Sequence, residues 1–338
     1  MAQLAKLDSW ITLLVLLAIN LISARVFGNL EFSFAIIKIV TIIAFVILVF
    51  YLLITNSSTK YGHVSWNNMM IDGGIFAKGP KGFLLGFQMV IFSFIGVELI
   101  GLTAAEAKEP KKTITRAIDQ LPVRIILFYV LAIFSILLAI PWTKVSTSSS
   151  PFVQALGATG IKNAGSIINF VVISAAISST NSFIYSAGRL LFSINYNGKN
   201  KISKHLGKLD HRQLPKNALI FSTVLIALAP FLNLFLKDAF TFISATATSM
   251  FLLIWSIMIV THMTYRKKTP RNELPTFRMP LYPISDIAVL TFFIAMIIVL
   301  LIFPNYRIPM ISAGIIFTVL VCITHFIQKK GINIKSSS

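Results

Sequence analysis

Long apolar runs separated by short polar segments dominate the sequence. Nine runs of mostly apolar residues lie at 9–27, 33–54, 83–104, 123–141, 166–189, 217–236, 239–262, 285–303 and 308–327. A helix needs about 20 such residues, with a range of about 17–25, to cross the hydrocarbon core of a bilayer. The pattern therefore predicts an all-α, polytopic membrane protein with about nine transmembrane helices.

Composition supports a membrane protein and excludes most other classes. The 338 residues are 56% apolar and only 12% charged, whereas soluble domains carry about 25% charged residues. The mean hydropathy is +0.82, which is too apolar for a soluble single core or a disordered chain. The single cysteine, Cys322, excludes a disulfide within the chain and a cysteine pair for a metal.

The sequence carries a large positive charge, with 30 Lys and Arg against 11 Asp and Glu. In a soluble protein this excess would suggest nucleic acid, but in a membrane protein it sets orientation. Most of the basic residues fall in the segments at 105–124, 189–216, 263–283 and 328–338. The positive-inside rule places these segments and the carboxyl terminus in the cytoplasm, and it places the amino terminus outside. No signal sequence precedes the first run, so we expect helices to be missing upstream.

Lys38 is an ionisable residue deep in an apolar run, within FSFAIIKIVTIIAF. A charged side chain at the membrane centre costs about 2.5–3.5 kcal/mol on insertion scales. Lys38 could snorkel towards the interface or form a structural pair. It could instead take the place of a metal cation or bind protons as part of transport.

Glu98 is the second such residue, in the run QMVIFSFIGVELIGLTAAEAKEP. It lies beside Gly96 and is followed by Gly101. Small residues around a carboxylate favour a broken or unwound helix, because irregular backbone at this depth requires protein or a watery cavity to satisfy it. The alternative is that the glycines allow two helices to pack closely and that Glu98 is paired with a neighbour.

A polar stripe from Ser178 to Ser182 interrupts the apolar run at 166–189. These side chains could line a cavity or form hydrogen bonds between helices.

Catalytic motifs are not found: the sequence has no Walker loop, no GxGxxG after a strand and no HExxH, and its five His have no metal-ligand spacing. We therefore expect no enzyme activity, no metal site and no cofactor.

A family resemblance becomes visible at the third run. The segment FSFIGVELIGLTAAEAKEPKKTITRAI resembles the sixth helix and following loop of bacterial amino acid permeases of the amino acid/polyamine/organocation superfamily. The match continues through PVRIILFYVLAI and INFVVISAAISSTNSFIYSAGRLLFSI and covers roughly residues 10–330. Within the amino acid transporter subfamily, DGGIFAKGPKGFLLGFQ and SPFVQALGATGIKNAGSIINFVV look most like D-serine/D-alanine/glycine transporters.

The resemblance implies an inverted-repeat transporter fold. Family members have twelve helices, the first ten forming two inverted five-helix repeats, and this sequence corresponds to helices 4 to 12. It is then a single permease domain, residues 1–338, with the first three helices missing. We expect residues 1–54 to be the remainder of the first repeat, 83–262 the second repeat, and 263–338 two carboxyl-terminal helices and a tail.

The resemblance also implies roles for particular residues. Lys38 matches a lysine of the fifth helix that is proposed to replace a sodium ion and couple uptake to protons. Ser179 and Asn181 would line the cavity from the eighth helix, close to that lysine. The unwound middle of the sixth helix would bind substrate through Phe92, Ser93, Phe94, Ile95, Gly96, Val97 and Glu98.

The implied function is proton-coupled uptake of a small neutral amino acid, such as D-alanine, D-serine or glycine, across the bacterial cytoplasmic membrane. The expected partners are this amino acid, protons and the lipid bilayer, with no nucleic acid. The oligomeric state stays open. The alternative hypothesis is a truncated permease fragment that does not transport.

Overall fold

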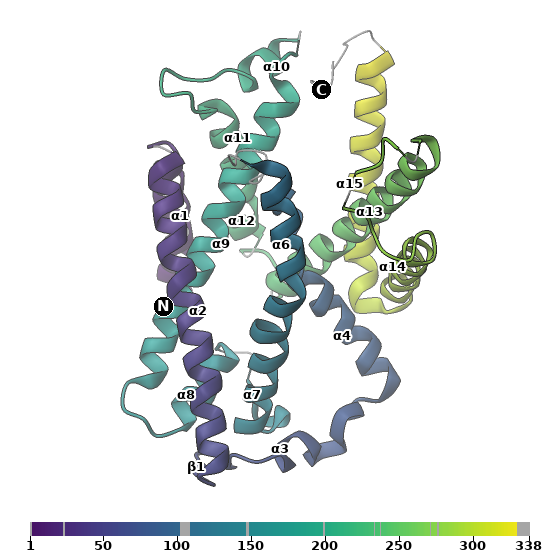
Figure 1. Ribbon diagram of the computed structural model, residues 1–338. Coiled ribbons are helices and arrows are strands. Elements are labelled where there is room, and N and C mark those ends of the chain that lie inside the picture. Colours follow the sequence, from purple (N-terminus) through teal and green to yellow (C-terminus); the bar gives the residue numbers. More distant parts are fainter. Residues whose placement is uncertain are drawn as a thin grey trace. The chain divides into compact units, whose positions relative to one another are not determined.

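The computed structural model describes residues 2–22, 24–101, 109–146, 149–198, 200–232, 234–236, 238–270, 272–275 and 277–329. Helices make up nearly all of its regular structure (Figure 1), which confirms the expected all-α class. The described strands form one small hairpin, in which β1 (Ser58–Thr59) pairs antiparallel with β2 (Gly62–His63). The chain divides into two compact units, and each is described by itself.

The first unit comprises residues 1–77, 104–193 and 205–226. Besides the hairpin, its elements are α1 (Ala2–Asn20), α2 (Ala24–Ile54), α3 (Asn67–Met70), the 3₁₀ segment η1 (Ile71–Phe76), α6 (Pro110–Ile125), the π-helical segment η2 (Ile126–Val130), α7 (Leu131–Ala139), the 3₁₀ segment η3 (Trp142–Lys144), α8 (Pro151–Ala158), α9 (Ala164–Asn195) and α11 (Lys216–Ile226). The short helix α10 (Lys201–Leu206) is divided between the residue ranges of the two units.

The core of the first unit lies between α2 and α7. Phe45 and Val49 are one helical turn apart on α2, so both face the same neighbour. They pack with Ile136 and Leu138 of α7 in one buried apolar cluster. The Phe45 ring also meets Phe152 of α8 edge-on, with ring centroids 5.2 Å apart. These contacts lie about two to three helical turns after Lys38 along α2 and hold this part of the helix against α7 and α8. They therefore fix the rotation of α2 about its own axis.

The second unit comprises residues 78–103, 194–204 and 227–338. Its main elements are α4 (Gly79–Ser93), α12 (Leu228–Leu232), α13 (Ala239–Lys268), α14 (Ile284–Ile302) and α15 (Pro304–Lys329). Leu252 of α13 and Leu300 of α14 are fully buried in a cluster that also contains Ile91 of α4 and Met310 of α15. The cluster packs α4, α13, α14 and α15 around one apolar core.

Six helices in the described part of the chain are long and apolar enough to cross a membrane. Each coincides with one of the nine apolar runs in the sequence. They are Glu31–Ile54, Lys112–Ala139, Ala164–Asn195, Ala239–Lys268, Ile284–Ile302 and Pro304–His325.

The other three apolar runs are shorter or interrupted. The apolar helix within run 9–27 extends over Ser9–Asn20, and run 217–236 is divided between α11 and α12. Pro230 has no N–H to donate to the carbonyl of Ile226, which is the residue where α11 ends. Run 83–104 is interrupted after Ser93, where α4 ends. The length of an apolar run in sequence therefore overestimates the length of the continuous helix at these three places.

Candidate functional site

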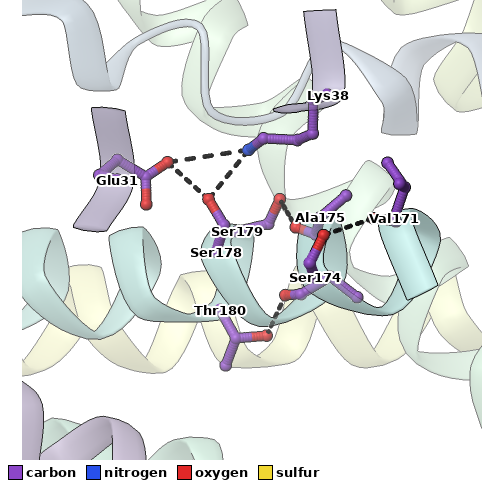
Figure 2. A network of polar contacts seen from close by, with 9 residues as sticks. Glu31, Lys38, Val171, Ser174, Ala175, Ser178, Ser179 and Thr180 are labelled. Carbon is purple, nitrogen blue, oxygen red and sulfur yellow. Dashed lines mark hydrogen bonds and ion pairs between the residues drawn. The ribbon is translucent and has the colours of Figure 1, made fainter. Parts of the chain in front are cut away.

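Lys38 lies on α2 and forms two polar contacts inside the first unit. Its Nζ donates a hydrogen bond of 2.9 Å to Oγ of Ser178 on α9, and it lies 3.8 Å from Oε1 of Glu31. The Ser178 hydroxyl in turn donates a hydrogen bond of 2.7 Å to the same Glu31 oxygen. Figure 2 shows this closed triangle of ammonium, hydroxyl and carboxylate. The hydroxyl therefore bridges the two opposite charges.

The positions of Glu31 and Lys38 follow from helical geometry. Residues seven apart are about two turns apart and lie on the same face of a helix. Both side chains remain about one quarter exposed, at 28% for Glu31 and 26% for Lys38. The second carboxylate oxygen of Glu31, Oε2, is buried and has no hydrogen-bond partner among the described residues. The network thus keeps one unused acceptor beside the lysine.

One face of α9 carries the buried polar groups next to this network. Ser174, Ser178 and Asn181 are all buried, and their spacing of four and three residues places them on one stripe. Asn181 accepts a hydrogen bond of 2.7 Å through Oδ1 from Nδ2 of Asn20 on α1. The polar stripe therefore forms hydrogen bonds between helices, as one of the two sequence hypotheses proposed.

Ser179 and Thr180 lie on the other side of α9. Ser179 is exposed and Thr180 is half-buried, and their hydroxyls donate to backbone carbonyls one turn earlier, Ser179 to Ala175 and Thr180 to Ala176, each at 3.0 Å. Figure 2 shows the Ser179 and Thr180 contacts beside the Lys38 network. The structure thus separates the two residues that the resemblance paired, since Asn181 is buried and Ser179 is exposed. Their lining of a transport cavity stays a prediction.

A second region of interest, in the second unit, is the end of α4. The helix ends at Ser93, and turns follow over residues 94–98. Backbone N–H groups here bond to the third residue before them, as in Ile95 to Phe92 and Val97 to Phe94, both at 3.2 Å. Gly96 has φ +105°, a conformation that side chains disfavour. The expectation of an interrupted helix agrees with this geometry.

The carboxylate of Glu98 folds back onto the interruption. The N–H of Gly96 donates to both of its oxygens, at 3.0 and 3.1 Å. Of the seven residues that the resemblance assigned to substrate binding, Phe94, Val97 and Glu98 also line a cavity of about 470 Å³ within the second unit. Phe92 contacts Phe240 edge-on, with centroids 6.3 Å apart. The substrate-binding role of all seven stays a prediction.

Sequence reasoning assigned no role to Glu31 and Asn20, and it placed Ser178 in the polar stripe without naming a partner for it. Glu31 and Ser178 complete the Lys38 network, and Asn20 binds Asn181. The spacing of Glu31 and Lys38 by about two helical turns could have predicted that the two side chains lie on the same face of one helix. The partners on α9 and α1 were not readable, because 140 and 161 residues separate Ser178 from Lys38 and Asn181 from Asn20.

Comparisons with known proteins give the family. The amino acid permease family matches residues 2–336 of the chain. Amino-acid permease AapA of Bacillus subtilis is 38% identical, over 97% of this chain and 71% of that protein. The D-serine/D-alanine/glycine transporter of Escherichia coli K12 is 34% identical, over 96% and 70%. DL-alanine permease SerP2 of Lactococcus lactis is also 34% identical, over 92% and 69%.

The match covers nearly the whole chain, so it includes both the Lys38 network and the interruption after α4. Relatives at 34–38% identity carry transporter names, and the long apolar helices are those of a multi-pass membrane protein. The resemblance seen in the sequence is confirmed. The chain belongs to the amino acid permease family of the amino acid/polyamine/organocation superfamily, whose members are transporters and not enzymes.

Proposed function

We propose that this protein takes up a small neutral amino acid, such as D-alanine, D-serine or glycine, across the bacterial cytoplasmic membrane together with protons. Family membership supports amino acid transport. The substrate class is supported by relatives that are named as D-serine/D-alanine/glycine transporter and DL-alanine permease. The carboxyl terminus lies in the cytoplasm in this proposal, because the basic residues concentrate in the segments on that side.

The contact between Lys38 and Ser178 carries the coupling part of the proposal. A protonated Lys38 donates to the hydroxyl at 2.9 Å and attracts the carboxylate of Glu31. Hydrogen bonds of a charged donor are roughly twice as strong as neutral ones. Loss of the proton therefore weakens the connection between α2 and α9. A proton bound at Lys38 then favours one arrangement of these helices over another, which is what coupling to a conformational change requires.

The interruption at residues 94–98 is the proposed place of substrate binding. Broken helices in transporters expose backbone dipoles that meet the carboxylate and ammonium groups of a zwitterion near the membrane midplane. The turn around Gly96 supplies irregular backbone of this kind. Residues 1–54 and 83–262 belong, in this proposal, to the two inverted repeats that alternate access around the site.

Uptake into proteoliposomes tests the proposal. The protein is reconstituted and supplied with radiolabelled D-alanine under an imposed pH gradient, acidic outside. Accumulation above equilibrium that collapses with a protonophore is expected. The variant Lys38→Ala should lose this accumulation while it still exchanges labelled for unlabelled D-alanine without a gradient.

Lys162→Ala is the matched control, because Lys162 is an exposed lysine between α8 and α9. It should accumulate D-alanine like the parent protein. Full accumulation by Lys38→Ala would show that the lysine is a structural partner of Glu31 and would end the coupling proposal. Absence of any exchange or uptake of D-alanine, D-serine and glycine by the parent protein would refute the substrate class.

A further inference from the structure

A cavity of about 470 Å³ lies within the second unit, between α4, α13 and α14. Its lining is almost wholly apolar, so a charged or zwitterionic ligand would lose its hydration there without compensation. Met258 of α13 and Phe292 of α14 belong to the lining and are also exposed. The cavity therefore opens to the surface of these helices and fits an apolar chain that enters through this opening.

The wall that α13 contributes continues to the charged end of this helix. Trp255 lies in the wall, against Phe293 of α14, with ring centroids 6.0 Å apart. Arg266 follows eleven residues later, which is about three helical turns and places it on nearly the same face. Eleven residues span about 16 Å along a helix, and one leaflet of the hydrocarbon core is about 15 Å thick, half of about 30 Å. Arg266 therefore lies about one leaflet's depth from Trp255.

The last turn of α13 carries three consecutive cations, Arg266, Lys267 and Lys268. Both lysines are exposed. The guanidinium of Arg266 lies 4.3 Å from the centroid of the Tyr282 ring, and its Nη1 is buried without a hydrogen-bond partner among the described residues. Arg266 also forms no ion pair with a described carboxylate. A planar guanidinium matches the geometry of a phosphate, so this end of α13 favours an anionic phosphate group.

Apolar side chains lie next to these cations. Leu281 and Ile284, on either side of Tyr282 in the sequence, are exposed, and so is Ile287 in the first turns of α14. A free phosphate ion gains nothing from this apolar surface or from the cavity. A phospholipid carries a phosphate and acyl chains in one molecule, and therefore matches both features.

We propose that an anionic phospholipid binds along α13 and α14, with its headgroup at Arg266, Lys267 and Lys268 and one acyl chain in the cavity beside Trp255. The negative headgroup compensates the three cations, and clusters of Lys and Arg at the end of a transmembrane helix attract anionic lipids. The acyl chain reaches the cavity because the separation equals one leaflet. This lipid site does not depend on the amino acid transport proposed above.

Fluorescence quenching by brominated lipids tests the site, because bromine on an acyl chain quenches a tryptophan that it approaches closely. The purified protein is placed in phosphatidylcholine nanodiscs that contain increasing mole fractions of phosphatidylglycerol with brominated chains. Phosphatidylcholine with the same brominated chains is the comparison without net charge. The difference between the parent protein and Trp255→Phe isolates the Trp255 signal. We expect half-maximal quenching of Trp255 at a mole fraction at least about fivefold lower for phosphatidylglycerol.

Arg266→Gln should remove most of this preference for phosphatidylglycerol. Arg307→Gln is the matched control and should keep it, because Arg307 is exposed and donates to the carbonyls of Leu301 and Ile302 at the other end of α14. If Arg266→Gln does not fold, the double variant Lys267→Gln/Lys268→Gln changes only exposed side chains and should lower the preference by a similar factor.

Equal quenching by the two brominated lipids would show unselective lipid contact and overturn the proposal. So would an unchanged preference in the Arg266 variant or in the double lysine variant, or no quenching of Trp255, which would mean that no acyl chain enters the cavity. Sodium phosphate should change the quenching no more than sodium chloride of equal ionic strength. A specific loss with phosphate would show a phosphate site in place of a lipid site. These readouts need no gradient and no amino acid, so their failure leaves the transport proposal intact.

Discussion

The Nδ1 atom of His262 lies 2.9 Å from Oδ2 of Asp286, and this contact joins α13 to the first turn of α14. Asp286 is fully buried, and its other carboxylate oxygen has no hydrogen-bond partner among the described residues. Tyr282 meets the His262 ring edge-on at 5.9 Å and lies under the guanidinium of Arg266 at 4.3 Å. The contact with His262 is therefore the main compensation for burying the Asp286 carboxylate.

Replacing His262 by Ala should destabilise the second unit. The change leaves a buried carboxylate without its hydrogen-bond partner, at a cost of about 1–3 kcal/mol. Thermal unfolding of the purified protein should show a lower melting temperature. His205→Ala is the control, because His205 is exposed and accepts a hydrogen bond through its backbone carbonyl. Equal melting temperatures for the two variants would contradict the structural role of the pair.

The amides of Asn20 and Asn181 should be energetically coupled. Their hydrogen bond of 2.7 Å is buried and joins α1 to α9. Each single change to Ala leaves a buried polar group unsatisfied, and the double change removes both, so the effects should be non-additive by about 0.5–3 kcal/mol. A double-mutant cycle in a reversible unfolding assay measures this term. Additive effects would mean that the two amides do not stabilise each other.

Gly96 and Gly86 should respond in opposite ways to a change to Ala. Gly96 has φ +105°, and a side chain in such a conformation costs about 1–3 kcal/mol. Gly86 lies inside α4, and a Cβ built there meets nothing within 4 Å. In a helix, Ala is favoured over Gly by about 0.5–1 kcal/mol. Gly96→Ala should therefore lower the melting temperature and the uptake rate, and Gly86→Ala should leave both unchanged or raise the melting temperature.

The hydroxyl of Ser178 should be required for D-alanine accumulation under a pH gradient. Ser178→Ala removes the group that accepts from Lys38 and donates to Glu31, so D-alanine accumulation under a pH gradient should fall by about tenfold. Ser178→Thr keeps a hydroxyl and should retain more of the accumulation. The control is Thr180→Ala, whose exposed hydroxyl donates to a carbonyl of its own helix. Accumulation equal to that of the parent in Ser178→Ala would remove the bridge from the coupling mechanism.

Asp210 should stabilise its loop only when it is ionised. The N–H groups of Leu214 and Arg212 donate to its carboxylate at 2.9 and 2.8 Å. The Leu214 N–H, as the largest cause, holds the pKa of Asp210 below its usual range. The stabilisation is therefore fully present above the unfolded aspartate pKa of about 3.9 and is lost as pH falls through the lower folded value.

Hydrogen exchange at Leu214 measures this effect. Asp210→Ala should reduce the protection of that amide at pH 7, and the difference from the parent protein should shrink as the pH approaches about 3. Protection that is equal in both proteins at pH 7 would show that the carboxylate does not order the loop.

The lengths of the apolar runs predicted much of the fold. The bilayer fixes how many apolar residues a spanning helix needs, and six of the nine runs are continuous helices of that kind. The places where a helix ends inside an apolar run were harder to predict from the sequence. The glycine at position 96 favoured a break in the third run, but the end of the apolar helix at Asn20 had no comparable signal.

The sequence by itself determined that the chain is a helical membrane protein, which family it belongs to, and that Lys38 and Glu98 need a special explanation. The family rests on the resemblance of segments such as FSFIGVELIGLTAAEAKEPKKTITRAI. The other conclusions rest on composition, run length and the cost of burying a charge in lipid, which need no knowledge of how the helices pack. Only the tertiary structure decided that Ser178 meets Lys38 while Ser179 is exposed, and that Asn20 meets Asn181. The reason is physical: a one-residue step turns a side chain by about 100° around a helix, and packing between distant helices decides which face is buried.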